Sequence, residues 1–217
     1  MPSFDAVAFD LDYTLAVTDR DRQALLDAAT DRADAHDIER TDYLDAHGAV
    51  AATETRAPIF ERLLTDDTDP AELATAYRSA VEAALEPVAG VPDLLATLRE
   101  SYRVGLLTDG PLVAQRGKLR TLGWTDLFDA VVITGDLPAG KPDRRAFAAI
   151  CEELGVQPAR TVYVGDRPEV DVRGAADAGL AVVQVLYPDG PEPHPAADAT
   201  VDRADLVARL PAVLDSL

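Results

Sequence analysis

The sequence predicts an α/β protein with a doubly wound parallel sheet and an all-helical segment inserted after the first strand. Three observations predict this fold class. From Val91 onward, short apolar runs alternate with amphipathic stretches, which is typical of parallel strands joined by helices. Residues 19–86 instead show helical periodicity with almost no clustering of β-branched residues. Finally, polar side chains follow four of the apolar runs, in one case after a short loop.

Each element follows from its local pattern. The run 6–9 is wholly apolar and predicts a buried strand. Within 19–86, apolar residues recur at helical spacing, and Asp69-Pro70 marks the start of the last helix before Pro87. The remaining predicted elements are strands 104–107, 130–133, 161–164 and 181–186 and helices 92–99, 112–122, 144–154, 172–178 and 206–214. The proline-rich segment 188–195 predicts a surface loop.

The composition excludes several classes of partner. A net charge of −19 leaves no basic stripe for nucleic acid or for an anionic membrane surface. The acidic residues are spread along the chain, which favours a solvated, self-repelling coat and a salt-loving host. Neither a transmembrane segment nor a secretory signal is predicted, so we expect a cytoplasmic protein. The single cysteine, Cys151, fits the apolar face of a helix and cannot form an internal disulfide.

Lysine is almost absent from the chain. Only Lys118 and Lys141 occur, and all other basic side chains are arginine. A compact ammonium supplies a point charge that the planar guanidinium does not, so both lysines are candidates for a specific role. Lys118 lies on a predicted helix whose apolar positions are Leu112, Leu119 and Leu122, and this spacing favours a solvated position for it.

Polar residues follow four predicted strands at their carboxyl ends, where ligands bind in open α/β sheets. The four groups, with the glycines and proline beside them, are Asp10, Asp12 and Thr14 after the first strand, Thr108, Asp109 and Gly110 after the second, Gly140, Lys141 and Pro142 after the third by way of a short loop, and Gly165, Asp166 and Asp171 after the fourth. The two aspartates of the first group also fit an acidic turn in an acidic chain. Taken together, the four groups contain what is needed to hold a divalent cation and a phosphate around a carboxylate nucleophile.

With these residues in view, the chain resembles a phosphatase of the haloacid dehalogenase superfamily. The matching motifs occur in the family's order and are Asp10-Leu11-Asp12-Tyr13-Thr14-Leu15, Leu107-Thr108-Asp109-Gly110, Gly140-Lys141-Pro142-Asp143 and Val164-Gly165-Asp166-Arg167-Pro168-Glu169-Val170-Asp171. The resemblance implies a Rossmann-like catalytic core at 1–16 and 88–217 and a helical cap at 17–87. One departure is Asp109, where the family more often has asparagine.

The resemblance also implies a role for each catalytic candidate. Asp10 is expected to attack phosphorus and form an aspartyl-phosphate. Asp12 is expected to protonate the leaving alcohol and then to deprotonate water, while its main-chain carbonyl binds metal. Thr108 is expected to hydrogen-bond a phosphoryl oxygen, and Lys141 to neutralise the phosphoryl oxygens and Asp10.

The same resemblance implies a phosphate cradle and a Mg²⁺ site. Main-chain groups of Leu11, Asp12, Asp109 and Gly110 are expected to contact the phosphate. Asp10, Asp12, Asp166 and Asp171 make up the expected metal site, with Asp166 binding Mg²⁺ directly. We expect Asp171 to orient the metal ligands rather than to bind Mg²⁺ itself.

Ordinary structural roles stay open for several residues. Thr14 also fits a cap on the turn after the first strand, and Asp171 fits the N-cap of helix 172–178. The three histidines lack the spacing of metal ligands. Within the segment 17–87, Tyr43, His47, Arg56 and Arg62 are candidates to contact substrate, although no spacing singles one out.

The leading functional hypothesis is a Mg²⁺-dependent phosphatase that acts on a small phosphorylated metabolite, as a monomer or a homodimer. A sugar phosphomutase would use the same residues. A 2-haloacid dehalogenase is a further alternative, but that chemistry has no use for an acid at Asp12. A non-catalytic binding protein on this scaffold is disfavoured by the presence of every acid and the lysine.

Overall fold

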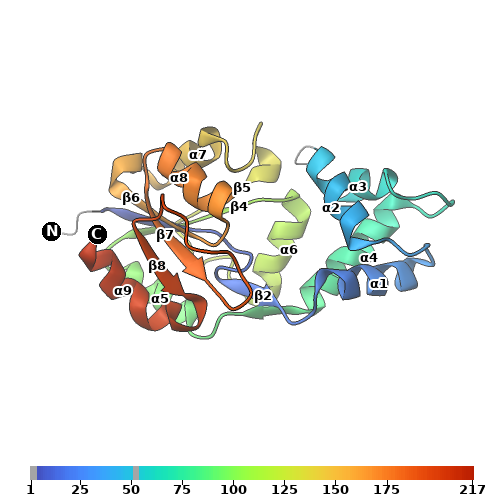
Figure 1. The fold of residues 1–217 in the computed structure, drawn as a ribbon, viewed down its shortest axis with the longest axis horizontal. Coiled ribbons are helices and arrows are strands. Elements are labelled where there is room, and N and C mark those ends of the chain that lie inside the picture. Colours follow the sequence, from blue (N-terminus) through green and yellow to red (C-terminus); the bar gives the residue numbers. More distant parts are fainter. Residues whose placement is uncertain (1–3, 51–53) are drawn as a thin grey trace.

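A six-stranded parallel sheet forms the centre of the computed structural model, which describes residues 4–50 and 54–217 (Figure 1). In spatial order, its strands are β5 (Ala130–Ile133), β4 (Arg103–Thr108), β1 (Ala6–Phe9), β6 (Thr161–Gly165), β7 (Ala181–Leu186) and β8 (Ala199–Asp202). The predicted doubly wound fold class is confirmed. Because β1 lies between β4 and β6, Phe9 is aligned with Leu106 on one side and Val164 on the other. The residues that follow these three strands therefore lie side by side.

Helices cover both faces of the sheet. One face packs against α5 (Val91–Leu98), α9 (Leu206–Ser216) and the buried Leu119 of α6 (Leu112–Leu122). The other face packs against α7 (Arg144–Leu154) and α8 (Arg173–Asp177). The side chains of β1 alternate between the two cores, as the two-residue period of a strand requires.

Local capping explains the boundaries of α7, which coincide with the prediction. The Asp143 carboxylate accepts a hydrogen bond from the Arg145 amide at 2.9 Å, which is an N-cap contact. At the other end, Gly155 adopts a left-handed conformation with φ of 67° and stops the helix. Between these ends, Phe147, Ile150 and Cys151 are buried in the sheet-facing core, so the expected core position of Cys151 is confirmed.

Between β1 and β4 in the sequence, the described residues include four helices that pack on one another beside the sheet (Figure 1). They are α1 (Arg22–Ala33), α2 (Arg40–Ala49), α3 (Ala57–Glu61) and α4 (Pro70–Ala83). Their buried side chains form a hydrophobic cluster of their own, separate from the two cores of the sheet. Asp69 caps α4 through its carboxylate, and Pro70 follows at the first helical position, as the sequence indicates.

The predicted element list differs from the structure in three places. The short strands β2 (Ala16–Thr18) and β3 (Leu85–Pro87) pair antiparallel at the two ends of the helical segment, where no strand was predicted. The strand β8 was also missed. Residues 168–172 form one π-helical turn before α8, so Asp171 lies inside that turn and is not the N-cap of a helix starting at 172. No helix in the described part of the chain is both long and apolar enough to cross a membrane.

Candidate active site

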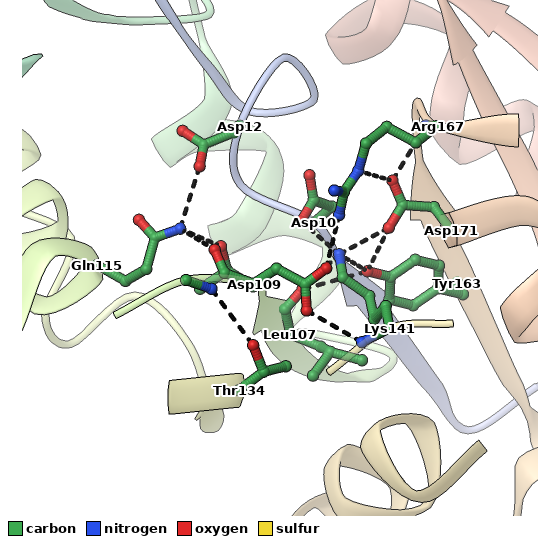
Figure 2. Close-up of polar contacts among 12 residues, drawn as sticks. Asp10, Asp12, Leu107, Asp109, Gln115, Thr134, Lys141, Tyr163, Arg167 and Asp171 are labelled. Carbon is green, nitrogen blue, oxygen red and sulfur yellow. Dashed lines mark hydrogen bonds and ion pairs between the residues drawn. The ribbon is translucent and has the colours of Figure 1, made fainter. Parts of the chain in front are cut away.

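The candidate site lies at the carboxyl ends of β1, β4 and β6, and its side chains converge there (Figure 2). Asp10 follows the buried run of β1, and its amide donates to the Val164 carbonyl at 2.9 Å, which continues the pairing with β6 for one more residue. This contact fixes the backbone from which the Asp10 carboxylate projects. The side chain is 3% exposed, so the carboxylate is almost fully removed from bulk water.

Lys141 lies between two buried carboxylates. Its Nζ is 2.6 Å from Asp10 Oδ1 and 2.6 Å from Asp171 Oδ1, and it also donates to the Tyr163 hydroxyl at 3.0 Å (Figure 2). Burial alone would lower the pKa of Lys141, but Asp10 and Asp171 outweigh it and raise that pKa well above its usual value. Lys141 is therefore a fixed positive charge beside the candidate nucleophile.

Asp171 is tied to the site by more than Lys141. Its Oδ2 accepts from the Arg167 amide at 3.0 Å and pairs with the Arg167 guanidinium at 3.3 Å. Burial opposes ionisation, yet Lys141 and Arg167 together hold the pKa of Asp171 below its usual value. For Asp10 the balance differs, because burial raises its pKa despite Lys141. The positive charge of Lys141 therefore does not fully offset the effect of burial on the Asp10 carboxylate.

The carboxylates of Asp10, Asp166 and Asp171 are close enough to share one cation. Each offers an oxygen within 4.8 Å of the others. Asp166 Oδ1 is buried with no hydrogen-bond partner within the described residues, while Asp166 Oδ2 accepts from the Tyr187 hydroxyl at 3.2 Å. Burial, with Asp171 nearby, raises the pKa of Asp166 to about 6. An unpaired buried carboxylate oxygen in an all-oxygen cluster fits a hard divalent cation such as Mg²⁺.

Asp12 is held apart from this cluster by α6. Lys118 Nζ is 2.6 Å from both Asp12 carboxylate oxygens, and Gln115 Nε2 donates to Asp12 Oδ2 at 3.1 Å. Removal from water opposes ionisation, but Lys118 and Gln115 hold the pKa of Asp12 below its usual value. The expected solvated position of Lys118 was wrong, because its side chain is only 6% exposed. The spacing of the apolar residues predicted the helix correctly. It did not show that the face carrying Lys118 packs against the site.

The phosphate-binding candidates lie after β1 and at the end of β4. Thr108 is buried, and its hydroxyl accepts from Gln115 Nε2 at 3.0 Å. The Gly110 amide donates to Thr134 Oγ1 at 3.3 Å, and the positive φ of 134° at Gly110 is accessible to glycine. After β1, Leu11 lies between Asp10 and Asp12 with its side chain in the core, and its carbonyl accepts from the Leu15 and Ala16 amides.

The charge on Asp109, unexpected beside a phosphate, has two partners in the structure. Its Oδ2 is 2.9 Å from the Arg167 guanidinium, and its Oδ1 accepts from the Lys141 amide at 3.1 Å. Arg167 thus neutralises the residue that departs from the family pattern. Thr14 is buried, and its hydroxyl has no partner within the described residues, so the alternative of a turn cap is wrong.

A cavity of about 320 Å³ opens above these residues, between the sheet and the helical segment. Asp10, Asp12 and Asp166 line it from the sheet side. From the helical segment, the lining includes Arg22, Leu25, Leu44, His47, Arg56, Tyr77 and Val81. Of the four substrate-contact candidates in this segment, His47 and Arg56 reach the cavity. Tyr43 is buried behind it, and Arg62 is not part of the lining.

Several site residues were not found from the sequence. Gln115, Tyr163, Arg167 and Tyr187 all contact a predicted site residue. Tyr187 comes directly after β7, so the strand-end rule that found the other groups would have found it had it been applied to a fifth strand. Gln115 carried no such signal, because a helical position alone does not tell which neighbour a side chain meets.

Comparison with known proteins agrees with this arrangement. A family model described as "haloacid dehalogenase-like hydrolase" matches residues 4–179. Human N-acylneuraminate-9-phosphatase is 31% identical over 177 residues, covering 82% of this chain and 69% of the human protein. Glyceraldehyde 3-phosphate phosphatase from Methanopyrus kandleri is 37% identical over 128 residues, but the match covers 57% of this chain and about half, 55%, of that relative.

Among solved structures, the crystal structure of a HAD phosphatase from Thermococcus onnurineus superimposes with a TM-score of 0.70 at 27% identity and covers 97% of each chain. The matched region of the family model includes all four strand ends and the helical segment. The match to the family model agrees with the sequence motifs, the sheet order and the convergence of Asp10, Asp12, Lys141 and Asp166. The chain therefore belongs to the haloacid dehalogenase-like hydrolase family.

Proposed function

We propose that this protein is a Mg²⁺-dependent phosphatase that hydrolyses small phosphate monoesters through an aspartyl-phosphate. The observation that carries the proposal is the presence of two aspartates, two residues apart, in two separate polar environments. Asp10 is bound to Lys141 inside the buried cluster, whereas Asp12 is bound to Lys118 and Gln115 and faces the cavity. Nucleophile and acid/base are separate tasks that require such separation.

The chain's own residues supply each step of the proposed reaction. Asp10 attacks phosphorus as the bond to the leaving oxygen breaks, and that oxygen takes a proton from the protonated form of Asp12, which is a minor form while Lys118 and Gln115 keep the pKa of Asp12 low. In the second step, Asp12 takes a proton from water, which attacks the aspartyl-phosphate and frees Asp10 and inorganic phosphate. Lys141 and the Thr108 hydroxyl stabilise the negative charge on the transferring group, assisted by main-chain groups of residues 11, 12, 109 and 110.

A Mg²⁺ ion would be held by carboxylates of Asp10 and Asp166 and by the main-chain carbonyl of Asp12. When bound, it supplies positive charge to the phosphoryl oxygens and favours the ionised form of Asp10. For Asp171 we propose an orienting role, since its carboxylate already contacts both Lys141 and Arg167. The unpaired Asp166 Oδ1 supports Asp166 as a direct ligand.

Asp12 helps to distinguish the phosphatase from the alternative functions. A 2-haloacid dehalogenase releases halide, which needs no proton from an acid, so the Lys118–Asp12 pair would have no purpose there. A phosphomutase would use the same residues, but it returns the phosphoryl group to the sugar, so sustained release of inorganic phosphate favours the phosphatase. A non-catalytic binding protein would not need an unpaired carboxylate oxygen in a buried acidic cluster.

The test is phosphate release from p-nitrophenyl phosphate with Mg²⁺ in molar salt. We expect wild-type protein to hydrolyse the ester and Asp10→Asn to abolish turnover. Asp202→Asn, at an exposed position at the end of β8, is the matched control and should retain full activity. Equal rates for wild type and Asp10→Asn would refute the assignment, whereas halide release from 2-chloropropionate would select the dehalogenase.

We further propose that residues 17–87 act as a cap over a core formed by 1–16 and 88–217. The separate hydrophobic cluster of α1 to α4 and the cavity between the two parts support this division. A cap of this kind restricts the substrate to a small phosphorylated metabolite and excludes water from the reaction. We propose a cytoplasmic location, a monomer or homodimer, and a salt-rich host, the last supported by the net charge of −19.

A further inference from the structure

Two arginines of the helical segment project into the active-site cavity and are held there by two tyrosines. Arg56 Nε donates to the Tyr43 hydroxyl at 3.1 Å, and the Arg56 guanidinium lies 5.5 Å from the centre of the Tyr77 ring. Arg22 shows the reciprocal arrangement, since it donates to the Tyr77 hydroxyl at 3.4 Å and lies 5.7 Å from the Tyr43 ring. We call Arg22, Tyr43, Arg56 and Tyr77 the Arg–Tyr cluster.

The tyrosines give the cluster a rigid base. Tyr43 and Tyr77 are buried, and their ring centres lie 5.3 Å apart. Phe60 packs against both rings, so all three aromatic residues belong to the hydrophobic cluster of α1 to α4. Burial raises the pKa of Tyr77 to about 12, which keeps this phenol neutral at physiological pH. The cluster therefore presents two positive charges on a neutral aromatic support.

Neither arginine of the cluster is paired with a carboxylate. The chain has 39 acidic residues, yet within 4–50 and 54–217 neither Arg22 nor Arg56 forms an ion pair. Each guanidinium has five N–H donors, and one tyrosine oxygen satisfies only one of them. Two unpaired cations inside the cavity of a strongly acidic protein would attract an anion.

We place this anion apart from the phosphate that reacts. The proposed phosphate site lies at the strand ends, whereas Arg22 and Arg56 line the cavity from α1 and from the residue before α3. His47 lines the same wall, and burial with the positive charges of Arg56 and Arg22 holds its pKa below the usual value. The positive wall thus faces whatever part of the substrate extends from the phosphate toward the helices.

We propose that Arg22 and Arg56 form a subsite for a second anionic group on the substrate, either a carboxylate or a second phosphate. The guanidinium plane binds either group through paired hydrogen bonds. The inference rests on the proposed phosphatase function and narrows it to esters that are charged at both ends. Its rival is a purely structural role, in which the arginines only support the packing of Tyr43 and Tyr77.

Three synthetic esters with the same three-carbon backbone test the subsite. They are 3-hydroxypropyl phosphate, 3-(phosphonooxy)propanoate and propane-1,3-diyl bisphosphate, which differ only in the terminal hydroxyl, carboxylate or phosphate. We expect wild-type kcat/KM to be about 10- to 100-fold higher for at least one charged ester than for the hydroxyl ester, since hydrogen bonds to charged groups have this effect. The charged ester with the higher kcat/KM shows whether the subsite binds a carboxylate or a second phosphate.

The variants Arg22→Gln and Arg56→Gln should each lower the ratio of charged-ester to hydroxyl-ester kcat/KM by about tenfold or more. The matched control is Arg32→Gln, because Arg32 lies on the same helix as Arg22 but lines a separate surface depression. It should leave the ratio unchanged. Variants that lose thermal stability but keep the wild-type ratio would establish the structural rival and overturn the proposal.

Calorimetric binding of the same three esters to Asp10→Asn separates the subsite from the phosphatase assignment. Affinity does not depend on turnover, so a protein that hydrolyses no ester would refute only the proposed reaction. Tighter binding of a charged ester, lost in Arg22→Gln or Arg56→Gln on the same background, would support the subsite. Equal affinities for the three esters would overturn it whether or not hydrolysis occurs.

Discussion

At the scale of single residues, the site contains a second charged pair, Lys118–Asp12, in addition to Lys141–Asp10. Lys118 contacts both carboxylate oxygens, and Gln115 links the same carboxylate to Thr108. A carboxylate that transfers protons must be held in line with the leaving oxygen, because small displacements are costly for catalysis. We therefore regard Lys118 as a positioning residue for Asp12.

Lys118→Met removes this contact while keeping a side chain of similar length. We expect kcat/KM for an alkyl phosphate, whose leaving group needs a proton, to fall about 100-fold. p-Nitrophenol leaves without protonation, so the first step on its phosphate should be less affected, whereas the second step still needs Asp12 as a base. Rapid-quench kinetics should show a burst of p-nitrophenol followed by slow turnover.

The conservative variant Lys118→Arg keeps the charge and should recover part of the alkyl phosphatase activity. A purely structural role for Lys118 predicts a different result, in which both substrates lose activity equally and no burst appears. That result would remove Lys118 from the mechanism while leaving Asp10 and the phosphatase assignment in place.

Tyr187 is a second residue whose contact has a testable consequence. Its hydroxyl donates to Asp166 Oδ2, and its ring contacts the Tyr13 ring, with ring centres 5.9 Å apart, and the Arg203 guanidinium, 4.2 Å from the ring centre. Partners that orient a metal ligand commonly change metal affinity by 10- to 100-fold. We expect Tyr187→Phe, which keeps the ring packing, to weaken Mg²⁺ binding by about tenfold in a calorimetric titration.

Tyr102→Phe serves as the control for this measurement, since Tyr102 packs against the outer part of the hydrophobic core and is not part of the site. Its Mg²⁺ affinity should equal that of wild type. Identical affinities for all three proteins would show that Asp166 does not depend on Tyr187 for its orientation.

Most of the candidate site could be predicted from the sequence because its parts lie at the ends of strands or in the loops and turns that follow them. Asp10, Thr108 and Asp166 follow buried runs, so their place at one edge of the sheet depends only on recognising parallel strands. Lys118 could not be placed in this way. A helix has several faces, and which one meets the site depends on how α6 packs across the end of the sheet.

At the scale of elements, the approach of β6 to the following π-helical turn leaves no room for a side chain at Gly165. A Cβ atom there would lie 2.7 Å from Asp171 Cβ and 2.9 Å from Asp171 Cγ. We expect Gly165→Ala to displace Asp171 from Lys141, to lower kcat by tenfold or more, and to cost about 1–3 kcal/mol of unfolding free energy. Steady-state kinetics and urea unfolding measure the two effects.

Gly48→Ala is the matched control, because a Cβ built at this exposed position of α2 meets no described atom within 4 Å outside its own stretch of helix. Alanine has a higher helix propensity than glycine, so this variant should be as stable as wild type or slightly more stable. If Gly165→Ala kept full activity, the contact between Lys141 and Asp171 would not be required for catalysis.

Long elements with a strong pattern were predicted well, and short ones were missed. The predicted bounds of α6, α7, β5 and β7 coincide with the structure, since each has a full apolar face or run between clear stop signals. The three-residue strands β2 and β3 are too short to show an alternation, and they are stabilised by pairing with each other across 66 intervening residues or more. Such pairing is tertiary information that a local pattern does not contain.

At the scale of the whole molecule, the excess of acidic residues opposes folding through repulsion between carboxylates. The net charge is −19, and the Debye length falls from about 10 Å at 0.1 M salt to about 3 Å at 1 M. Among the described residues, most ion pairs outside the active site lie at the surface, where each contributes little to stability. Screening should therefore relieve more repulsion than it removes attraction.

We expect the midpoint of thermal unfolding to rise as KCl is increased from 0.1 M to 2 M. Relief of about 2 kcal/mol corresponds to a rise of about 4–8 °C for a chain of this size. The control is the same titration near the sequence pI of about 4.3, where the net charge is small. Salt also strengthens apolar burial, but that effect does not depend on protein charge and would persist at the pI. An equal rise at both pH values would show that burial, and not charge screening, makes the protein salt-stable.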